Sequence, residues 1–306
     1  MYSNVKRTKD YKNQMQDHIK NFFGIDAVSL IPAKRGFYGE TWRLDTVDAS
    51  FFLKLVYAAE HIESYKRSFS VLAHLCDHGI DFISRIIKAK GGRLYTEFDD
   101  AILGVFDWID GELTETDETK IPEYRMLAKV YTVPTDGVCI PREDFSGRFT
   151  DIFFERWKSL DDTPLLALLK KNREKIEHRA KRLKHFANLC RNGETSFFIT
   201  HGDAGGNLIV NNGSYFLVDW DNPLLAPPER DAWVMCSRDW AREAFQTALH
   251  DNGISHTLSP ERLAFYGYDF FFYYLNAFLD ASADAKAVRE YFNGWIEDSF
   301  KYFDKL

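Results

Sequence analysis

The stretch FFITHGDAGGNLIVNNGSYFLVDWD, residues 197–221, carries the strongest evidence for the fold and function of this chain. Three apolar runs within it are expected to form short strands: 197–199, 208–210 and 215–218. Asn-Asn-Gly at 211–213 is typical of a tight turn, because Asn and Gly tolerate positive φ. The resulting hairpin would bring Asp203, Asn207 and Asp219 to one end of a small sheet.

Oxygen ligands from Asn and Asp suit a hard cation such as Mg²⁺, which prefers one or two carboxylates together with substrate phosphates. A further Asp beside them could orient an attacking hydroxyl group, and this combination is typical of phosphoryl transfer. Taken singly, His201-Gly-Asp could be an ordinary loop and Asp219 a strand-end residue. The complete series in this order favours the phosphoryl-transfer interpretation.

Residues 197–231 resemble the catalytic segment of the aminoglycoside phosphotransferase and choline kinase family, relatives of the protein kinases. The continuation DWDNPLLAPPERD, residues 219–231, is similar to that of spectinomycin phosphotransferase-like members. The resemblance implies roles for four residues: Asp203 as the catalytic base, Asn207 and Asp219 as Mg²⁺ ligands, and Asp221 beside the metal, where it is also a candidate substrate contact.

The chain departs from the family in the loop that joins these residues. The family usually has four residues between its catalytic Asp and its Asn, whereas this chain has three between Asp203 and Asn207. Gly205 and Gly206 could let the shorter loop close, because glycine accepts backbone conformations that other residues cannot adopt.

Composition limits the possible classes of protein. The 306 residues are enough for two lobes with a substantial core. A net charge of −7 argues against a nucleic-acid partner and is compatible with a cationic substrate. The four cysteines are widely spaced, and neither a signal peptide nor a membrane-spanning run is visible, so we expect a cytoplasmic protein with free thiols and no membrane partner.

The N-terminal third has the pattern of a kinase-like nucleotide lobe. We expect a helix at 9–23 ended by Gly24, a helix at 58–77, and strands at 27–31, 41–46 and 51–57. The resemblance adds several candidate ATP contacts: Gly36 and Gly39 of a phosphate loop, Lys54 on the third strand for the α/β-phosphates, Glu63 (or Glu60) as the partner of Lys54, and the hinge residues Phe106, Asp107 and Trp108.

The rest of the chain is mainly helical in pattern. Helices are expected at 121–132, 165–191, 232–249, 259–280 and 285–304. The fourth of these is dense in aromatic residues, which favours a core position. In the family the substrate cleft is lined from such helices, so four of its residues are also substrate candidates: Tyr266, Tyr268, Asp269 and Tyr273.

These observations predict an α+β, two-lobed protein-kinase-like fold. The small β-rich lobe would span 1–107, with a hinge at about 104–112, and a larger helical lobe would span 108–306. The predicted activity is ATP- and Mg²⁺-dependent phosphorylation of a small hydroxyl-bearing substrate, with an aminoglycoside or aminocyclitol as the first choice. Choline, a sugar or another metabolite remains open, as does a nucleotide-binding pseudokinase. The oligomeric state does not follow from the sequence.

Overall fold

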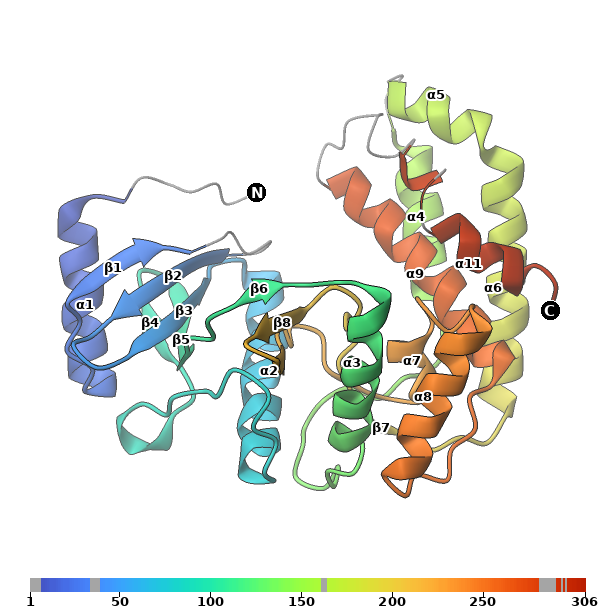
Figure 1. Cartoon of the computed structure of the whole chain (residues 1–306). Coiled ribbons are helices and arrows are strands. Elements are labelled where there is room, and N and C mark those ends of the chain that lie inside the picture. Colours follow the sequence, from blue (N-terminus) through green and yellow to red (C-terminus); the bar gives the residue numbers. More distant parts are fainter. Residues whose placement is uncertain (1–6, 34–38, 161–163, 281–289, 293, 295) are drawn as a thin grey trace. The chain divides into compact units, whose positions relative to one another are not determined.

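The computed structural model describes residues 7–33, 39–160, 164–280, 290–292, 294 and 296–306 (Figure 1). The chain forms two compact units. Unit 1 comprises Met1–Pro141 and His201–Leu224, and unit 2 comprises Arg142–Thr200 and Leu225–Leu306. A small antiparallel sheet region followed by a mainly helical part confirms the predicted α+β class. The lobe boundary at residue 107 stays a prediction.

Unit 1 contains a five-stranded antiparallel sheet in the order β1-β2-β3-β5-β4. Its strands are β1 (Ser29–Pro32), β2 (Gly39–Asp45), β3 (Ser50–Val56), β4 (Thr96–Phe98) and β5 (Ala101–Asp107). The helix α1 (Lys9–Phe23) ends at Gly24, whose φ of 74° is the left-handed conformation that glycine adopts most readily. Met15 and Ile19 of α1 are fully buried in one core cluster with Leu53 and Leu103 of the sheet. The predicted helix, its stop signal and the three strands are thus confirmed within a few residues.

The same unit also holds residues 201–221 of the stretch 197–221. Its further elements are α2 (Ala59–Asp77), the 3-10 turn η1 (Lys90–Gly92), β6 (Glu112–Leu113), α3 (Asp117–Val130), β8 (Leu208–Asn211) and β9 (Ser214–Leu217). The strands β8 and β9 form the predicted hairpin, and its turn residues Asn212 and Gly213 have φ of 48° and 81°. The helix α3 begins four residues before the predicted start, because Thr116 and Thr119 form a capping box.

Unit 2 is mainly helical. Its elements are α4 (Arg148–Lys158), α5 (Pro164–Lys171), α6 (Arg173–Asn192), β7 (Phe198–Thr200), most of β10 (Leu224–Ala226), α7 (Glu229–Ala232), α8 (Asp239–Asp251), α9 (Pro260–Asp280) and α11 (Ile296–Phe303). The aromatic helix α9 packs against both α4 and α6 and is the centre of this unit (Figure 1). The helix predicted at 165–191 is divided at Asn172 into α5 and α6. The helix predicted at 232–249 begins seven residues later, as α8, and only Ala232 of the predicted range lies in α7. The predicted start of the last helix, at 285, lies outside the described residues.

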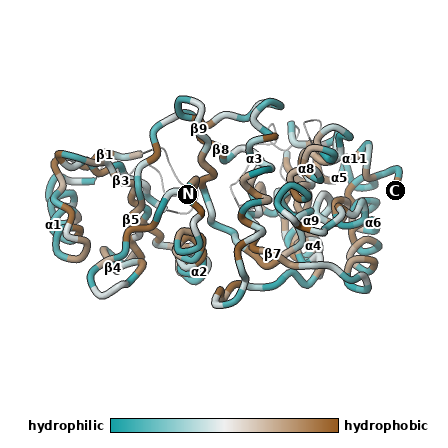
Figure 2. Tube along the Cα trace, turned by 60° about the horizontal axis from the view of Figure 1, so that its bottom comes forward, coloured by the Kyte–Doolittle hydropathy of each residue, from teal (hydrophilic) through white to brown (hydrophobic). Residues whose placement is uncertain are grey.

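Hydropathy follows this arrangement along the chain. The strands β3 and β5 are largely hydrophobic, whereas α6 is hydrophilic over most of its length (Figure 2). One charged side chain of α6 forms an ion pair instead of facing solvent: Arg179 is buried, and its Nη2 lies 2.8 Å from Glu297 of α11. None of the described helices is both long enough and apolar enough to cross a membrane.

Candidate active site

The short loop between Asp203 and Asn207 closes despite its three-residue spacer. The Asn207 Nδ2 group donates to the Asp203 backbone carbonyl at 2.6 Å and to its carboxylate Oδ2 at 3.2 Å. Gly206 has a φ of 124°, which residues with a side chain rarely adopt. The two residues that the sequence pairs are therefore in contact, and the backbone conformation of Gly206 explains how the loop turns.

His201 anchors this loop to the strand that leads to Asp219. Its ring is buried, the Nδ1 atom accepts from the Asp203 N–H at 3.2 Å, and the other nitrogen, Nε2, lies 2.8 Å from the Val218 carbonyl. An accepting Nδ1 implies that the proton is on Nε2, which then donates to Val218. We did not predict a role for His201, although its place in the His-Gly-Asp triplet is visible in the sequence.

Lys54 lies on β3 and is 9% exposed. Its ammonium group contacts both oxygens of Asp221, at 2.5 and 2.6 Å, and Asp219 Oδ1 at 3.3 Å. Burial acts to lower the pKa of Lys54, but the carboxylates of Asp221 and Asp219 outweigh it and raise that pKa, so the ammonium stays charged. The structure thus joins the predicted strand lysine to the Asp-Trp-Asp motif.

The two further carboxylates of the site differ in their titration. Burial raises the pKa of Asp203, as do the carboxylates of Asp219 and Asp221, although His201 acts against them. For Asp219, burial acts in the same upward direction, but the Lys54 ammonium prevails and lowers the pKa. The side chain of Asp219 is 48% exposed and its φ is 65°. The site therefore combines a carboxylate inclined to accept a proton with one that stays ionised and reachable from solvent.

The helix α2 contacts this site through hydroxyl groups rather than through a glutamate. Tyr65 Oη donates to Asp221 Oδ2 at 2.5 Å, Ser64 Oγ donates to the Asp221 carbonyl at 3.3 Å, and Ser68 Oγ donates to the Trp220 carbonyl at 2.5 Å. None of these three residues was predicted from the sequence.

Glu63, the predicted partner of Lys54, is not in contact with it in this structure. Its carboxylate lies 2.7 Å from Lys66 one turn further along α2, and its side chain is 68% exposed. A helix position that points to solvent cannot supply the buried carboxylate that a buried lysine needs. Asp221 supplies that carboxylate instead.

The predicted hinge residues use their backbone groups within the sheet. Phe106 pairs with Phe52 of β3. Asp107 donates its N–H to the Arg85 carbonyl at 2.9 Å and accepts from Ser84 Oγ at 2.7 Å, and the Trp108 N–H donates to the Ser50 carbonyl at 3.2 Å. Over the described part of the chain, the next donors, the N–H groups of Ile109 and Asp110, make no hydrogen bond.

The structure describes only one of the two glycines of the predicted phosphate loop. Gly36 lies outside the described residues. Gly39 opens β2 opposite Val56, and a Cβ atom placed there would lie 1.9 Å from the Leu55 carbonyl oxygen. Close strand packing is therefore sufficient reason for glycine at position 39.

The substrate candidates on α9 belong to unit 2, whereas Asp203, Asn207 and Asp219 belong to unit 1. Tyr266 is buried, and Tyr273 packs edge-on against the ring of Phe149 at 5.2 Å. Burial raises the pKa of Asp269 to about 8, with a further contribution from the Glu143 carboxylate, and none of the described residues hydrogen-bonds to the buried Asp269 Oδ1.

Tyr268 has a different role from these neighbours on α9. Its hydroxyl group donates to Asp304 at 2.6 Å, and its ring is fully buried against that of Phe300. Tyr268 is thus a packing residue that ties α9 to the C-terminal segment.

The residues present fit a magnesium ion that is shared with phosphates. Asn207 donates its Nδ2 to Asp203, which leaves the amide oxygen as an acceptor, and Asp219 offers an accessible carboxylate. Mg²⁺ commonly takes one or two protein ligands of this kind and completes its shell with water and phosphate oxygens. Among the described residues, no group of three or more His, Cys, Asp or Glu side chains could hold a metal by itself.

The phosphotransferase enzyme family matches this chain over residues 29–266. Among curated proteins, none matches the chain in sequence. The matched range includes every residue of the site described above in unit 1.

Solved structures of low identity share the fold. A spectinomycin phosphotransferase in complex with ADP and spectinomycin superposes with a TM-score of 0.72 at 19% identity, covering 96% of this chain and 93% of the other. An aminoglycoside phosphotransferase from Alicyclobacillus acidocaldarius gives 0.64 at 13% identity, with 99% and 96% covered. The choline kinase LicA from Streptococcus pneumoniae gives 0.62 at 14% identity, with 97% and 100% covered. These similarities confirm the predicted kinase-like fold.

Proposed function

Because the chain belongs to the phosphotransferase enzyme family, we propose that it transfers the γ-phosphoryl group of ATP to a hydroxyl group of a small molecule. One observation carries the proposal: Lys54, Asp219 and Asp221 form one charged cluster in unit 1, beside the Asp203–Asn207 contact. Catalysis of this kind depends on positioning and charge neutralisation, for which such a cluster is suited.

Each of these residues has a proposed task. Asp203 accepts the proton of the attacking hydroxyl, and Asn207 fixes its carboxylate. Lys54 holds the α/β-phosphates. Asn207 and Asp219 would hold Mg²⁺, which when bound neutralises charge on the phosphates. Asp221 serves Lys54 rather than the substrate, because both of its oxygens already contact the ammonium group.

We propose that adenine is bound by backbone groups that follow directly after the predicted hinge residues Phe106, Asp107 and Trp108. The backbone groups of Asp107 and the N–H of Trp108 are used inside the sheet, whereas the N–H groups of Ile109 and Asp110 are available among the described residues. We therefore assign adenine recognition to Ile109 and Asp110. A cytoplasmic location, where ATP is abundant, fits this use of nucleotide.

An aminocyclitol or aminoglycoside is the proposed substrate class. Support comes from the superposition with a spectinomycin phosphotransferase and from the net charge of −7, which suits a cationic ligand. Tyr266, Asp269 and Tyr273 of unit 2 are proposed as substrate residues on the family resemblance alone, because Tyr266 is 1% exposed and Asp269, with a pKa of about 8, is mostly protonated near neutral pH. The superposition with a choline kinase makes choline the second candidate.

The test is Mg²⁺-dependent ATP turnover by the purified protein with spectinomycin, other aminoglycosides, choline and simple sugars. We expect one member of this panel to be phosphorylated. Asp203→Ala should then lose about 10³-fold in turnover while keeping the rise in melting temperature that MgATP produces. Normal turnover by Asp203→Ala would refute the assignment of the base. No shift with nucleotide and no direct binding at high concentration would refute the kinase proposal itself.

A further inference from the structure

The connection between α2 and Lys54 differs from the one that the sequence predicts. We propose that Tyr65, acting through Asp221, positions Lys54 for the nucleotide phosphates, in the place where the family resemblance implies a helix glutamate. The inference rests on the proposed function, because it concerns the residue that would hold the phosphates. It assigns a positioning role to a tyrosine for which the sequence motif gives no signal.

The packing of α2 on the sheet explains why Tyr65 can reach this place. Gly104 of β5 lies opposite Lys54 in the sheet. A Cβ atom at Gly104 would approach the Phe69 ring to 2.9 Å, so the missing side chain lets Phe69 lie directly on the strand. Tyr65 precedes Phe69 by one helical turn and therefore shares its face of α2. The close packing of α2 at Gly104 therefore places Tyr65 next to Lys54.

Tyr65 makes two separate contacts with the charged pair. Its hydroxyl group donates to Asp221 Oδ2 at 2.5 Å, and its ring centroid lies 4.6 Å from the Lys54 ammonium nitrogen. Tyr65 itself is 2% exposed. A cation over an aromatic face and a charge-assisted hydrogen bond both gain strength when water is excluded. The tyrosine therefore supports both partners of the ion pair at once.

This arrangement also has a consequence for ligand exchange. When phosphates draw Lys54 away, Asp221 would lose the ammonium group that contacts both of its oxygens. An unpaired carboxylate at a largely buried position is costly. The Tyr65 hydroxyl group stays as a donor to Asp221, while Ser64 holds the Asp221 backbone. Tyr65 therefore lowers the cost of releasing Lys54 to the nucleotide.

The experiment compares Tyr65→Phe with Glu63→Gln, the matched change at the predicted position on the same helix. The affinities of MgADP and of adenosine are measured for each variant by calorimetry. For Tyr65→Phe we expect MgADP to bind about tenfold more weakly, as befits loss of a hydrogen bond to a charged group, with adenosine within about twofold of wild type. For Glu63→Gln both affinities should stay within about twofold.

The adenosine measurement separates positioning from a general loss of structure. Weakening of both ligands alike by Tyr65→Phe, or of neither, would overturn the inference, and so would a loss seen with Glu63→Gln instead. If Tyr65→Phe does not fold, Asp221→Asn breaks the same link from the other side and must show the same selective loss of MgADP. A wild-type protein that binds neither ligand would refute the proposed function, which is a different result from any of these.

Discussion

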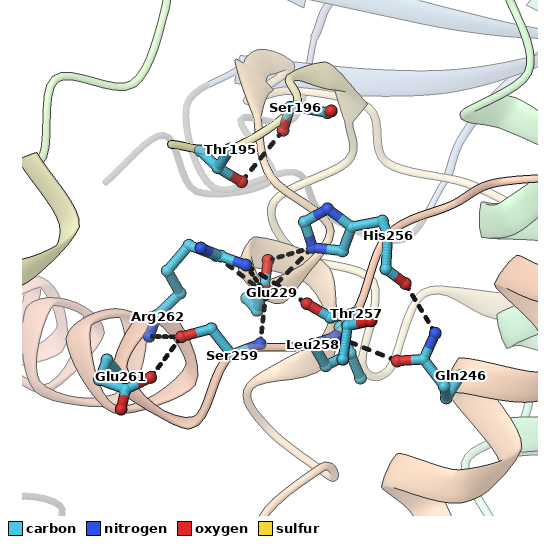
Figure 3. Close-up of polar contacts among 10 residues, drawn as sticks. All are labelled: Thr195, Ser196, Glu229, Gln246, His256, Thr257, Leu258, Ser259, Glu261 and Arg262. Carbon is cyan, nitrogen blue, oxygen red and sulfur yellow. Dashed lines mark hydrogen bonds and ion pairs between the residues drawn. The ribbon is translucent and has the colours of Figure 1, made fainter. Parts of the chain in front are cut away.

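Two clusters of carboxylate and cation, one in each unit, use the same chemistry for different ends. In unit 1, Lys54 contacts Asp219 and Asp221, and the Asp219 side chain is 48% exposed. In unit 2, Glu229 is fully buried and contacts His256 and Arg262 (Figure 3). The first cluster can exchange a partner with a ligand from solvent, whereas the Glu229 carboxylate of the second cluster is closed to solvent.

The hydrogen bonds around Glu229 explain why the second cluster is structural. The carboxylate accepts from the Ser259 N–H at 2.7 Å and from Arg262 Nε at 2.9 Å, and His256 Nε2 lies 3.1 Å from both of its oxygens. Gln246 fixes the same loop by bonding to the His256 carbonyl and the Leu258 N–H (Figure 3). A buried charge with this many donors is stabilised in place, and the segment before α9 is fixed to α7.

The largest effect on turnover is expected from removing the charge of Asp219 in the first cluster. Asp219→Asn should reduce turnover by about 10³-fold or more, because a metal ligand and its charge are lost. The melting temperature should change little, since Lys54 keeps both contacts with Asp221. Steady-state kinetics and thermal melting measure the two effects, with the exposed Asp48→Asn as the control in the same unit. A variant that melts much lower than wild type would show that Asp219 is structural, like Glu229.

The second cluster should give the opposite result. Glu229→Ala should lower the free energy of unfolding by about 3–5 kcal/mol, because it leaves the buried His256 and the part-buried Arg262 without their shared carboxylate. The ratio of MgADP affinity to adenosine affinity should not change in the protein that still folds. Urea denaturation measures the loss, and Glu243→Gln on the exposed face of α8 is the control. Full stability of Glu229→Ala would remove the contrast between the two clusters.

Asp269, a third carboxyl group, should make the stability of the protein depend on pH. Asp269 has a folded pKa of about 8 and an unfolded value near 4. The stability that its protonated form contributes is therefore complete below about pH 4 and is lost as the pH rises through about 8. Asp269→Asn removes this dependence. The melting temperature of the variant minus that of wild type should rise by several degrees between pH 5 and pH 9, and a flat difference, like that of the exposed control Asp151→Asn, would contradict it.

The smallest effect is expected at the surface pair of Glu63 and Lys66. The Glu63 side chain is 68% exposed, and solvent screens the attraction between the two charges. Glu63→Gln should leave thermal melting and turnover within experimental error. A clear loss of turnover would return Glu63 to the role that the sequence predicts for it and would weaken the case for Tyr65.

Local signals in the sequence were sufficient to predict most of the helices and strands. The stop at Gly24, the turn at Asn212-Gly213 and the apolar run around Lys54 each depend on near neighbours in the chain. The breaks in the longer helices did not show in the pattern. The helix predicted at 165–191 ends early at α5, because Asn172 bonds its side-chain amide to the Leu168 carbonyl and interrupts the helix.

The contacts of α2 with the site could not be predicted from the sequence, because they join residues that lie far apart in the chain. Tyr65 and Asp221 are 156 residues apart, and Ser68 and Trp220 are 152 apart. Helical periodicity places Tyr65 on a buried face, but it does not say which segment covers that face. Glu63 is predicted because the family resemblance implies a glutamate on this helix and Glu63 lies further into the helix than Glu60. The structure shows that its direction on the helix decides otherwise.

The order in which the chain visits its two units bears on how such a protein can evolve. The chain leaves unit 1 after Pro141, returns at His201 and leaves again after Leu224. A single genetic crossover therefore cannot exchange unit 2 as a whole between two relatives, because three junctions would have to be joined correctly. New substrate preferences, if unit 2 sets them as we propose, would arise more readily by point substitution along α9 than by recombination of gene segments.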